Sequence, residues 1–255
     1  MDQTGRKAAP GAGGAAAAWL VHLLTASGAV IALMALMAVI AGDFRLALLW
    51  LLAGLAIDGV DGSLARLARV KERAPRIDGD TLDLIIDYLT YVFVPALFIV
   101  EAALVPAAAA PWLAGLILVS ALYNFTRRDL KTKDNYFRGF PALWSVVAFY
   151  LYVATPAPEV AAAIVVALAA LTFAPVHFVH PFRVADYGRW LPALALLWAA
   201  ATAALLWPDW QDGTRRALLA VSLATAAILF ALGLMRTARG PRPRPAGGAQ
   251  APLAG

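Results

Sequence analysis

Long apolar runs separated by short polar segments make up most of this chain. A helix needs about 20 mainly apolar residues to cross a bilayer. Runs of about that length fall at 18–41, 46–67, 79–104, 111–128, 140–155, 158–179, 190–207 and 215–235. The pattern predicts an all-α fold, a polytopic transmembrane helix bundle of about eight spans.

The composition supports a membrane protein. The 255 residues are 62% hydrophobic and 15% charged, whereas soluble domains are about half apolar and about one quarter charged. There is no cysteine, which excludes disulfides, thiolate catalysis and cysteine-ligated zinc or iron–sulfur sites.

The basic residues predict an orientation, because Lys and Arg accumulate on the cytoplasmic side of a membrane. If both termini are cytoplasmic, only Arg45, Arg215 and Arg216 of the 21 Lys and Arg residues fall on the opposite side. Since the basic residues follow the topology rather than one soluble patch, we expect no nucleic-acid partner. We expect a flexible segment at 1–17, a transmembrane domain at 18–236 and a disordered basic tail at 237–255.

Two consecutive predicted spans carry acidic residues on one face each. Asp58 and Asp61 lie three residues apart, and Gly79, Asp83 and Asp87 lie four residues apart. Residues with these spacings share a face of a helix. A short cytoplasmic connection joins the two spans, so the acidic faces are expected to meet near the cytoplasmic end.

Carboxylates in a membrane helix are costly, about 2.5–3.5 kcal/mol each on insertion scales. An oxygen-only ligand set without nearby His or Cys selects Mg²⁺ or Mn²⁺, and two such ions would neutralise four carboxylates. The alternative interpretation, helix caps or acids paired with Arg66 or Arg69, suits Asp78 and Asp80 better. His22, His177 and His180 are expected to support packing rather than bind metal.

Written as a pattern, the acidic stretch is D-x2-D-G-x2-A-R-x12-G-x3-D-x3-D. It resembles the signature of the CDP-alcohol phosphotransferases, integral membrane enzymes of phospholipid synthesis. The twelve-residue gap between Arg66 and Gly79 is similar to the bacterial phosphatidylcholine synthase branch, as are the segments at 19–30, 132–152 and 176–190. Ser145 departs from the asparagine expected after Trp144.

The resemblance implies transfer of a phosphatidyl group from CDP-diacylglycerol to choline by direct attack, giving phosphatidylcholine and CMP. It also implies a multi-pass protein of the bacterial inner membrane with its active site on the cytoplasmic side, and a possible homodimer. Asp87 would accept the proton of the choline hydroxyl, and two Mn²⁺ or Mg²⁺ ions would be bound. The implied site residues are the metal ligands Asp58, Asp61, Asp83 and Asp87, the nucleotide-site residues Gly62, Ala65 and Gly79, and Arg66 at a phosphate.

Choline carries a quaternary ammonium, which proteins bind with aromatic faces. The candidates are Tyr123 or Tyr136 together with Asp186 and Tyr187, although aromatic residues at helix ends are also common interfacial anchors. The basic segment 127–137 is either an ordinary cytoplasmic loop or a contact to phosphates.

Two other functions stay open from the sequence. Another alcohol of the same superfamily, such as serine, glycerol phosphate or inositol phosphate, could be the acceptor. A carboxylate-based cation transporter would instead place acids near the middle of the membrane, within repeated halves, and no internal repeat is visible.

Overall fold

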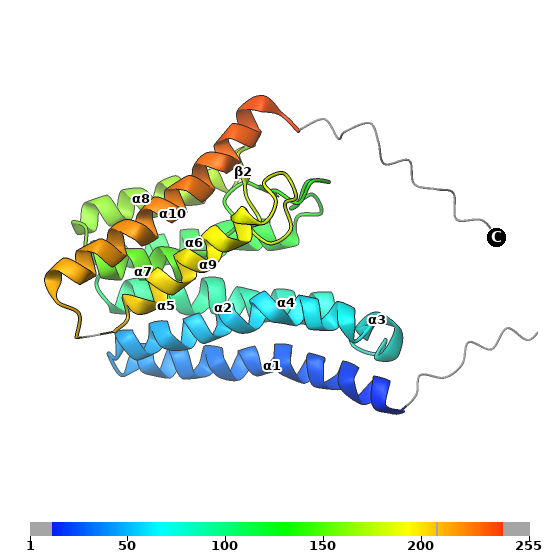
Figure 1. The fold of residues 1–255 in the computed structure, drawn as a ribbon. Helices are drawn as coiled ribbons and strands as arrows, with labels where there is room; N and C mark the ends of the chain where they lie inside the picture. The colour runs from blue at the N-terminus through cyan, green and yellow to red at the C-terminus, as the bar shows by residue number, and fades with distance from the viewer. Residues whose placement is uncertain (1–11, 208, 242–255) are drawn as a thin grey trace, which may run out of the picture.

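The computed structural model describes residues 12–207 and 209–241, and helices account for most of them (Figure 1). The longest are α1 (Ala12–Ile40), α2 (Phe44–Leu67) and α10 (Asp212–Arg239). The others are α3 (Val70–Arg73), α4 (Gly79–Asp87), the π-helix η1 (Tyr88–Phe93), α5 (Val94–Glu101), α6 (Ala110–Thr126), α7 (Trp144–Ala154), α8 (Pro158–Leu171) and α9 (Trp190–Ala204).

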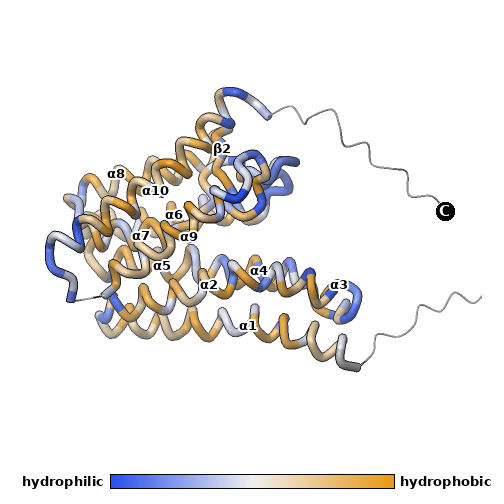
Figure 2. The backbone as a smooth tube through the Cα atoms, viewed as in Figure 1, coloured by the Kyte–Doolittle hydropathy of each residue, from blue (hydrophilic) through white to orange (hydrophobic). Residues whose placement is uncertain are grey.

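The prediction of a mostly helical membrane protein is confirmed. Among the described residues, four helical segments are long and apolar enough to cross a bilayer, namely Gly14–Ile40, Phe44–Leu67, Gly79–Glu101 and Asp212–Arg239. Four shorter apolar helices, α6 to α9, lie between them in the chain. Figure 2 shows apolar residues along the helices and hydrophilic residues gathered at the two ends of the bundle. This is the distribution expected of helices in a bilayer.

The predicted domain boundaries, at 17/18 and 236/237, fall inside the first and the last helix of the structure. Helix α1 begins at Ala12, within the segment expected to be flexible, and α10 continues to Arg239, beyond the predicted end of the domain at 236. Residues 1–11 and 242–255 lie outside the described part of the chain, so the predictions made for them stay predictions.

The third predicted span is not one regular helix. Between α4 and α5 the backbone widens into η1, directly after Asp87. Pro95 lies in the first turn of α5, and since proline has no backbone N–H, the regular hydrogen-bond ladder cannot be completed before it. A π-helical turn is one way to absorb such an interruption, and these turns are frequent at functional sites.

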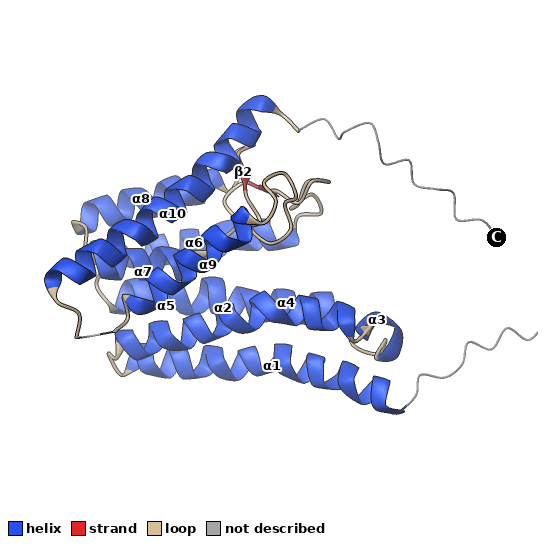
Figure 3. Cartoon of the chain, in the orientation of Figure 1, coloured by secondary structure: helices blue, strands red, loops and turns tan. Residues whose placement is uncertain are grey.

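Two connections at one end of the bundle are held together by a short antiparallel pair of strands (Figure 3). Strand β1 (Phe137–Arg138) pairs with β2 (His177–Phe178), with Phe137 opposite Phe178 and Arg138 opposite His177. An all-helical prediction did not include these strands, because two residues are too few to give a periodic pattern.

Gly139 follows β1 at a position that requires glycine. Its φ is +76°, and a β-carbon there would run into the backbone carbonyl of Thr172. Left-handed backbone costs a non-glycine residue about 1–2 kcal/mol even without a clash. Gly139→Ala is therefore expected to lower the free energy of unfolding by at least about 2 kcal/mol, measured as a lower thermal midpoint of the purified protein in detergent.

Gly188→Ala is the matched control for this prediction. Gly188 also has a positive φ, +58°, but a β-carbon there would meet nothing within 4 Å. The Gly188→Ala variant should lose only the stability that glycine contributes at a positive φ. Equal losses of stability in Gly188→Ala and Gly139→Ala would therefore contradict the role given to the carbonyl of Thr172.

Candidate active site

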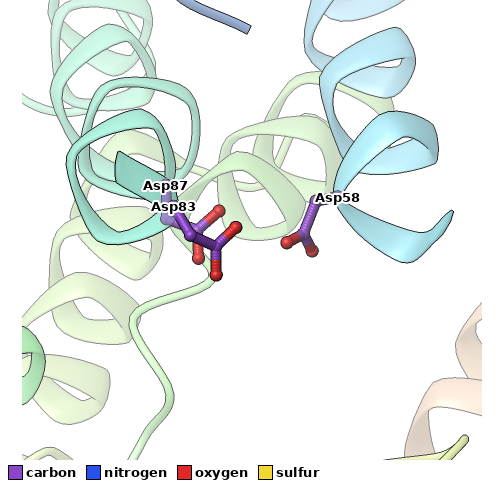
Figure 4. A group of neighbouring side chains, drawn as sticks. All are labelled: Asp58, Asp83 and Asp87. Atoms are coloured by element: carbon purple, nitrogen blue, oxygen red, sulfur yellow. The ribbon is translucent and has the colours of Figure 1, made fainter. Parts of the chain in front are cut away.

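Three carboxylates from two helices meet in the half of the bundle that carries the strand pair. Asp58 belongs to α2, and Asp83 and Asp87 belong to α4; one oxygen of each lies within 4.8 Å of the others. Figure 4 shows Asp58 pointing across toward Asp83 and Asp87. All three are half-buried, so their negative charges repel one another more strongly than they would in water. A hard divalent cation fits this oxygen-only group.

Local sequence explains how α4 presents its two acids. Asp78 caps the helix, accepting hydrogen bonds from the backbone N–H groups of Asp80 and Thr81 at 3.1 Å each. The prediction that Asp78 is a cap is thus confirmed. One turn of helix separates Asp83 from Asp87, so the two carboxylates lie one above the other on the same face.

Asp61 is placed differently from the other three acids. It is buried, and its carboxylate accepts a hydrogen bond of 2.7 Å from the hydroxyl of Thr25 on α1. The structure therefore brings Asp58, Asp83 and Asp87 into one group and directs Asp61 toward α1. Metal binding by Asp61 stays a prediction.

Tyr91 holds one carboxylate of the group in place. Its hydroxyl donates a hydrogen bond of 2.8 Å to Oδ2 of Asp58, and the side chain is buried at 4% exposure. Tyr91 belongs to η1, so the widened helix delivers this donor to α2. Partners of this kind, behind the ligating groups, orient metal ligands.

Tyr91→Phe is expected to weaken the binding of Mn²⁺ at the carboxylate group by about 10-fold or more, because Asp58 loses its donor. Binding is measured as the rise of the thermal midpoint with Mn²⁺ concentration in detergent micelles. Tyr152→Phe is a suitable control, since that ring packs against Phe44 and Phe98 away from the acids. An unchanged affinity for Mn²⁺ in Tyr91→Phe would show that Tyr91 does not orient Asp58 for metal binding.

Two basic residues, Lys131 and Arg183, lie near the three aspartates. They belong to the connections that carry β1 and β2. The pKa of Lys131 is lowered by burial and then by the positive charge of Arg183, against the opposing effect of Asp83, Asp58 and Asp87. Lys131 is therefore close enough to Arg183 and to the three aspartates to feel their charges. A β-carbon built on Gly62 would lie 3.6 Å from Nη2 of Arg183. The region thus combines a carboxylate group with positive charge, which suits a substrate carrying phosphates.

Comparison with known proteins gives this arrangement a family. The family model for CDP-alcohol phosphatidyltransferase matches residues 18–176. The chain belongs to the CDP-alcohol phosphatidyltransferase family. The acidic signature, and with it Asp58, Asp83 and Asp87, lies within the matched region.

Several relatives are similar over most of their length. A phosphatidylcholine synthase of Pseudomonas aeruginosa is 44% identical over 88% of this chain and 93% of its own. A phosphatidylcholine synthase of Bradyrhizobium diazoefficiens is 40% identical over 88% and 84% of the two chains. One of Legionella pneumophila is 41% identical over 67% of each. The resemblance predicted from the acidic signature is confirmed.

Three of the residues predicted for the nucleotide of this CDP-alcohol phosphatidyltransferase, Gly62, Ala65 and Arg66, lie near the C-terminal end of α2. A β-carbon built on Gly62 would lie close to two guanidinium groups, 3.6 Å from Nη2 of Arg183 and 3.7 Å from Nη1 of Arg66. Arg66 is exposed and donates to Oγ of Ser63 at 2.9 Å. These positions are compatible with a phosphate contact, which stays a prediction.

The other two predicted nucleotide residues pack against the protein. Ala65 lies on a small apolar cluster built around Ala18, Val70 and Ala74. A β-carbon on Gly79 would lie 3.1 Å from Cε1 of His22, so this glycine lets α4 approach α1 closely. Packing explains both residues without a ligand, and a nucleotide contact by either stays a prediction.

The four predicted choline residues are only partly brought together. The hydroxyl of Tyr136 donates to Asp186 at 2.9 Å, and Tyr187 also contributes to the raised pKa of Tyr136, after burial and Asp186. Tyr123 instead packs on Phe173, with ring centroids 4.8 Å apart. The ring of Tyr136 is fully buried, and the guanidinium of Arg236 lies 5.5 Å from its centroid.

That cluster already holds a cation. The ring of Tyr136 faces Arg236 rather than an open space, and Arg236 is further paired with Asp134 at 2.7 Å. The contacts therefore account for Tyr136 as a structural residue. Choline binding at Tyr123, Tyr136, Asp186 and Tyr187 stays a prediction that these contacts do not support.

Sequence reasoning did not assign individual roles to Thr25, Tyr91, Lys131 and Arg183. The two basic residues were visible only as members of basic cytoplasmic loops, and topology alone explains such residues. His180 stacks on Phe137 with ring centroids 5.5 Å apart. Its pKa is lowered to about 4 by burial and by the charges of Lys131 and Arg183, which keeps the imidazole neutral beside the two cations.

Proposed function

We propose that this protein transfers the phosphatidyl group of CDP-diacylglycerol to choline, giving phosphatidylcholine and CMP. The observation that carries the reaction type is the group of Asp58, Asp83 and Asp87 in a chain of the CDP-alcohol phosphatidyltransferase family. Choline is indicated by relatives that are named phosphatidylcholine synthase and are up to 44% identical.

The donor set fits a metal cofactor. Three carboxylates with oxygens within 4.8 Å of one another offer the ligands that Mg²⁺ and Mn²⁺ prefer. When bound, such an ion polarises the diphosphate and stabilises the departing CMP. Asp58, Asp83 and Asp87 would hold it, and a second ion would involve Asp61 as well.

The chain's own residues account for the rest of the reaction. Lys131 and Arg183 place positive charge where the diphosphate binds, and Arg66 extends this region toward the solvent. Asp87 takes the proton of the choline hydroxyl as the choline oxygen bonds to the phosphatidyl phosphorus and the bond from that phosphorus to CMP breaks. A carboxylate positioned as general base contributes about 10²–10⁴-fold in rate.

We further propose that α1, α2, the α4–α5 segment and α6 to α10 are eight spans with both termini in the cytoplasm. In support, α1 begins and α10 ends at the same end of the bundle, which also carries the strand pair (Figure 1). The active site then faces the cytoplasm from the inner membrane of a bacterium, within a transmembrane domain at 18–236. A homodimer fits the family, and cross-linking of membranes would test it.

The acceptor is tested by supplying membranes that contain the protein with CDP-diacylglycerol, Mn²⁺ and one labelled alcohol at a time. We expect label in lipid from choline, and at least about 100-fold less from serine, glycerol phosphate or inositol phosphate. Asp58→Asn is the control for background enzymes. Incorporation of serine or glycerol phosphate but not choline would show that the acceptor is wrong while leaving the reaction type intact.

A further inference from the structure

The last turns of α10 pack against the connection that carries β2 (Figure 1). Gly233 permits this close approach, because a β-carbon there would run into the backbone carbonyl of His177. One turn later, the hydroxyl of Thr237 accepts a hydrogen bond of 2.8 Å from the backbone N–H of His177. The end of α10 is therefore fixed to the β2 connection at two points.

Arg236, the residue before Thr237, holds the other connection. Its Nε donates to Oδ2 of Asp134 at 2.7 Å, and its Nη2 donates to Oδ1 at 3.3 Å. The guanidinium also lies 5.5 Å from the ring centroid of the buried Tyr136. The side chain of Arg236 is only 9% exposed, so water and salt screen this ion pair less than they screen an exposed one. A two-point contact of this kind fixes direction as well as distance.

Asp134 lies at the tip of a tight turn, and Lys131 lies at the base of the same turn. Two hydrogen bonds close it: the backbone N–H of Thr132 donates to the carbonyl of Tyr136 at 2.8 Å, and the backbone N–H of Tyr136 donates to the hydroxyl of Thr132 at 3.0 Å. Lys131 directly precedes Thr132. By its contacts with Asp134 and Tyr136, Arg236 therefore holds the turn from which Lys131 projects.

The ammonium group of Lys131 is available to bind an anionic group. None of the ion pairs among residues 12–207 and 209–241 includes Lys131, and its Nζ lies 4.9 Å from the ring centroid of Phe137. It is nevertheless close enough to the three aspartates for their charges to act on it. The position of the turn therefore decides how far this positive charge reaches toward the acidic group.

We propose that Arg236 is a positioning residue for the transfer reaction: through Asp134 it holds the turn that directs Lys131 at the diphosphate of the donor. The inference rests on the proposed function, since that function gives Lys131 its ligand. The part of the chain that matches the family model ends at residue 176, so α10 lies outside it. The last helix thus contributes to donor binding without touching the donor.

Arg236→Ala is expected to raise the KM for CDP-diacylglycerol, measured as its mole fraction in detergent micelles, by about 10-fold. This is about the effect of losing one hydrogen bond to a charged group. The KM for choline should stay within about twofold, because choline has no negative charge for Lys131 to bind. A merely structural role of Arg236 would lower the amount of active enzyme, and so kcat, without this selective change in KM.

Arg239→Ala is the matched control for this variant. Arg239 is exposed in the last turn of the same helix, and its loss should leave both KM values within about twofold of wild type. An unchanged KM for CDP-diacylglycerol in Arg236→Ala, an equal rise for both substrates, or an equal rise in Arg239→Ala would overturn the proposal.

Asp134→Asn breaks the same link from the other side. The side chain of Asp134 is 26% exposed, so water can reach the guanidinium that this variant leaves without its partner, and Asp134→Asn decides the question if Arg236→Ala does not fold. It should raise the KM for CDP-diacylglycerol about as much as Arg236→Ala, and the two changes together should be no worse than either alone, because they remove one interaction. An unchanged KM in Asp134→Asn would overturn the proposal.

Lys131→Ala tests whether the link acts through Lys131. Alone it should raise the KM for CDP-diacylglycerol by about 10-fold. Adding Asp134→Asn should then raise it by less than about twofold, whereas independent effects would multiply to about 100-fold. Multiplied effects, or a normal KM in Lys131→Ala, would overturn the route through Lys131. Failure of the proposed function would appear separately, as no choline-dependent release of CMP by the wild-type protein.

Hydrogen exchange adds a readout that does not depend on turnover. The backbone amides of Thr132 and Tyr136 close the turn, and in Asp134→Asn they should exchange at least about 10-fold faster than in wild type, because the turn opens locally. The amides of α6 should exchange as in wild type. Unchanged exchange in the turn, or an equal increase in both segments, would overturn the proposal.

Discussion

Asp87→Asn is expected to lower kcat by about 10³-fold or more while the protein stays folded. The variant removes the group that takes the choline proton, a contribution of about 10²–10⁴-fold, and it removes one of three carboxylates from the group. Because like charges in the group repel, loss of one charge should not lower the thermal midpoint measured without metal. Release of CMP by purified protein in detergent measures the first effect, and thermal unfolding measures the second.

Asp80→Asn is the control on the same helix. Asp80 is exposed and pairs with Lys71 at 2.6 Å, outside the three-carboxylate group. Because exposed ion pairs contribute little, the activity of the Asp80→Asn variant should stay within about twofold of wild type. Near-normal turnover in Asp87→Asn would show that Asp87 is not the general base. A large loss in both variants would point to a disturbed α4 instead.

Removal of divalent metal is expected to abolish activity, and addition of Mn²⁺ or Mg²⁺ should restore it. Metal should also stabilise the fold, because a ligand that binds only the folded state at 100 times its Kd adds about 2.7 kcal/mol. The measurement is CMP release after dialysis against EDTA, followed by metal titration with the thermal midpoint recorded in parallel.

Two variants show where the metal acts. Asp58→Asn and Asp83→Asn should each lose most of the metal-dependent rise in thermal midpoint, whereas Asp80→Asn should keep it. Full activity in EDTA would contradict the metal requirement, and an unchanged metal response in Asp58→Asn would place the metal elsewhere.

Helical spacing predicts the acidic group, but it does not predict that Asp61 faces α1 while Asp58 faces the other aspartates. Residues three apart on a helix differ by about 60° in direction, so Asp58 and Asp61 share a broad face and yet point to different neighbours. The position of α1 decides the difference, since Thr25 of α1 hydrogen-bonds Asp61. Sequence periodicity carries no information on where a third helix packs.

The same limit explains the residues around the group. Tyr91 reaches Asp58 because η1 widens the helix before Pro95, and no pattern of apolar positions predicts a π-helical turn. Lys131 and Arg183 come near the same acids from connections that are far apart in the sequence, and the pairing of β1 with β2 holds these connections together. The choline prediction depended on aromatic residues near helix ends, and the fold places Tyr136 under Arg236 and Tyr123 elsewhere.

The most direct test of the account is a stoichiometry measurement on the purified protein. With CDP-diacylglycerol, labelled choline and Mn²⁺, we expect CMP and labelled phosphatidylcholine to appear in equal amounts, and neither to appear in EDTA or with Asp87→Asn. Release of CMP without phosphatidylcholine, or formation of phosphatidylcholine in the absence of divalent metal, would contradict transfer to choline at the Asp58, Asp83 and Asp87 group.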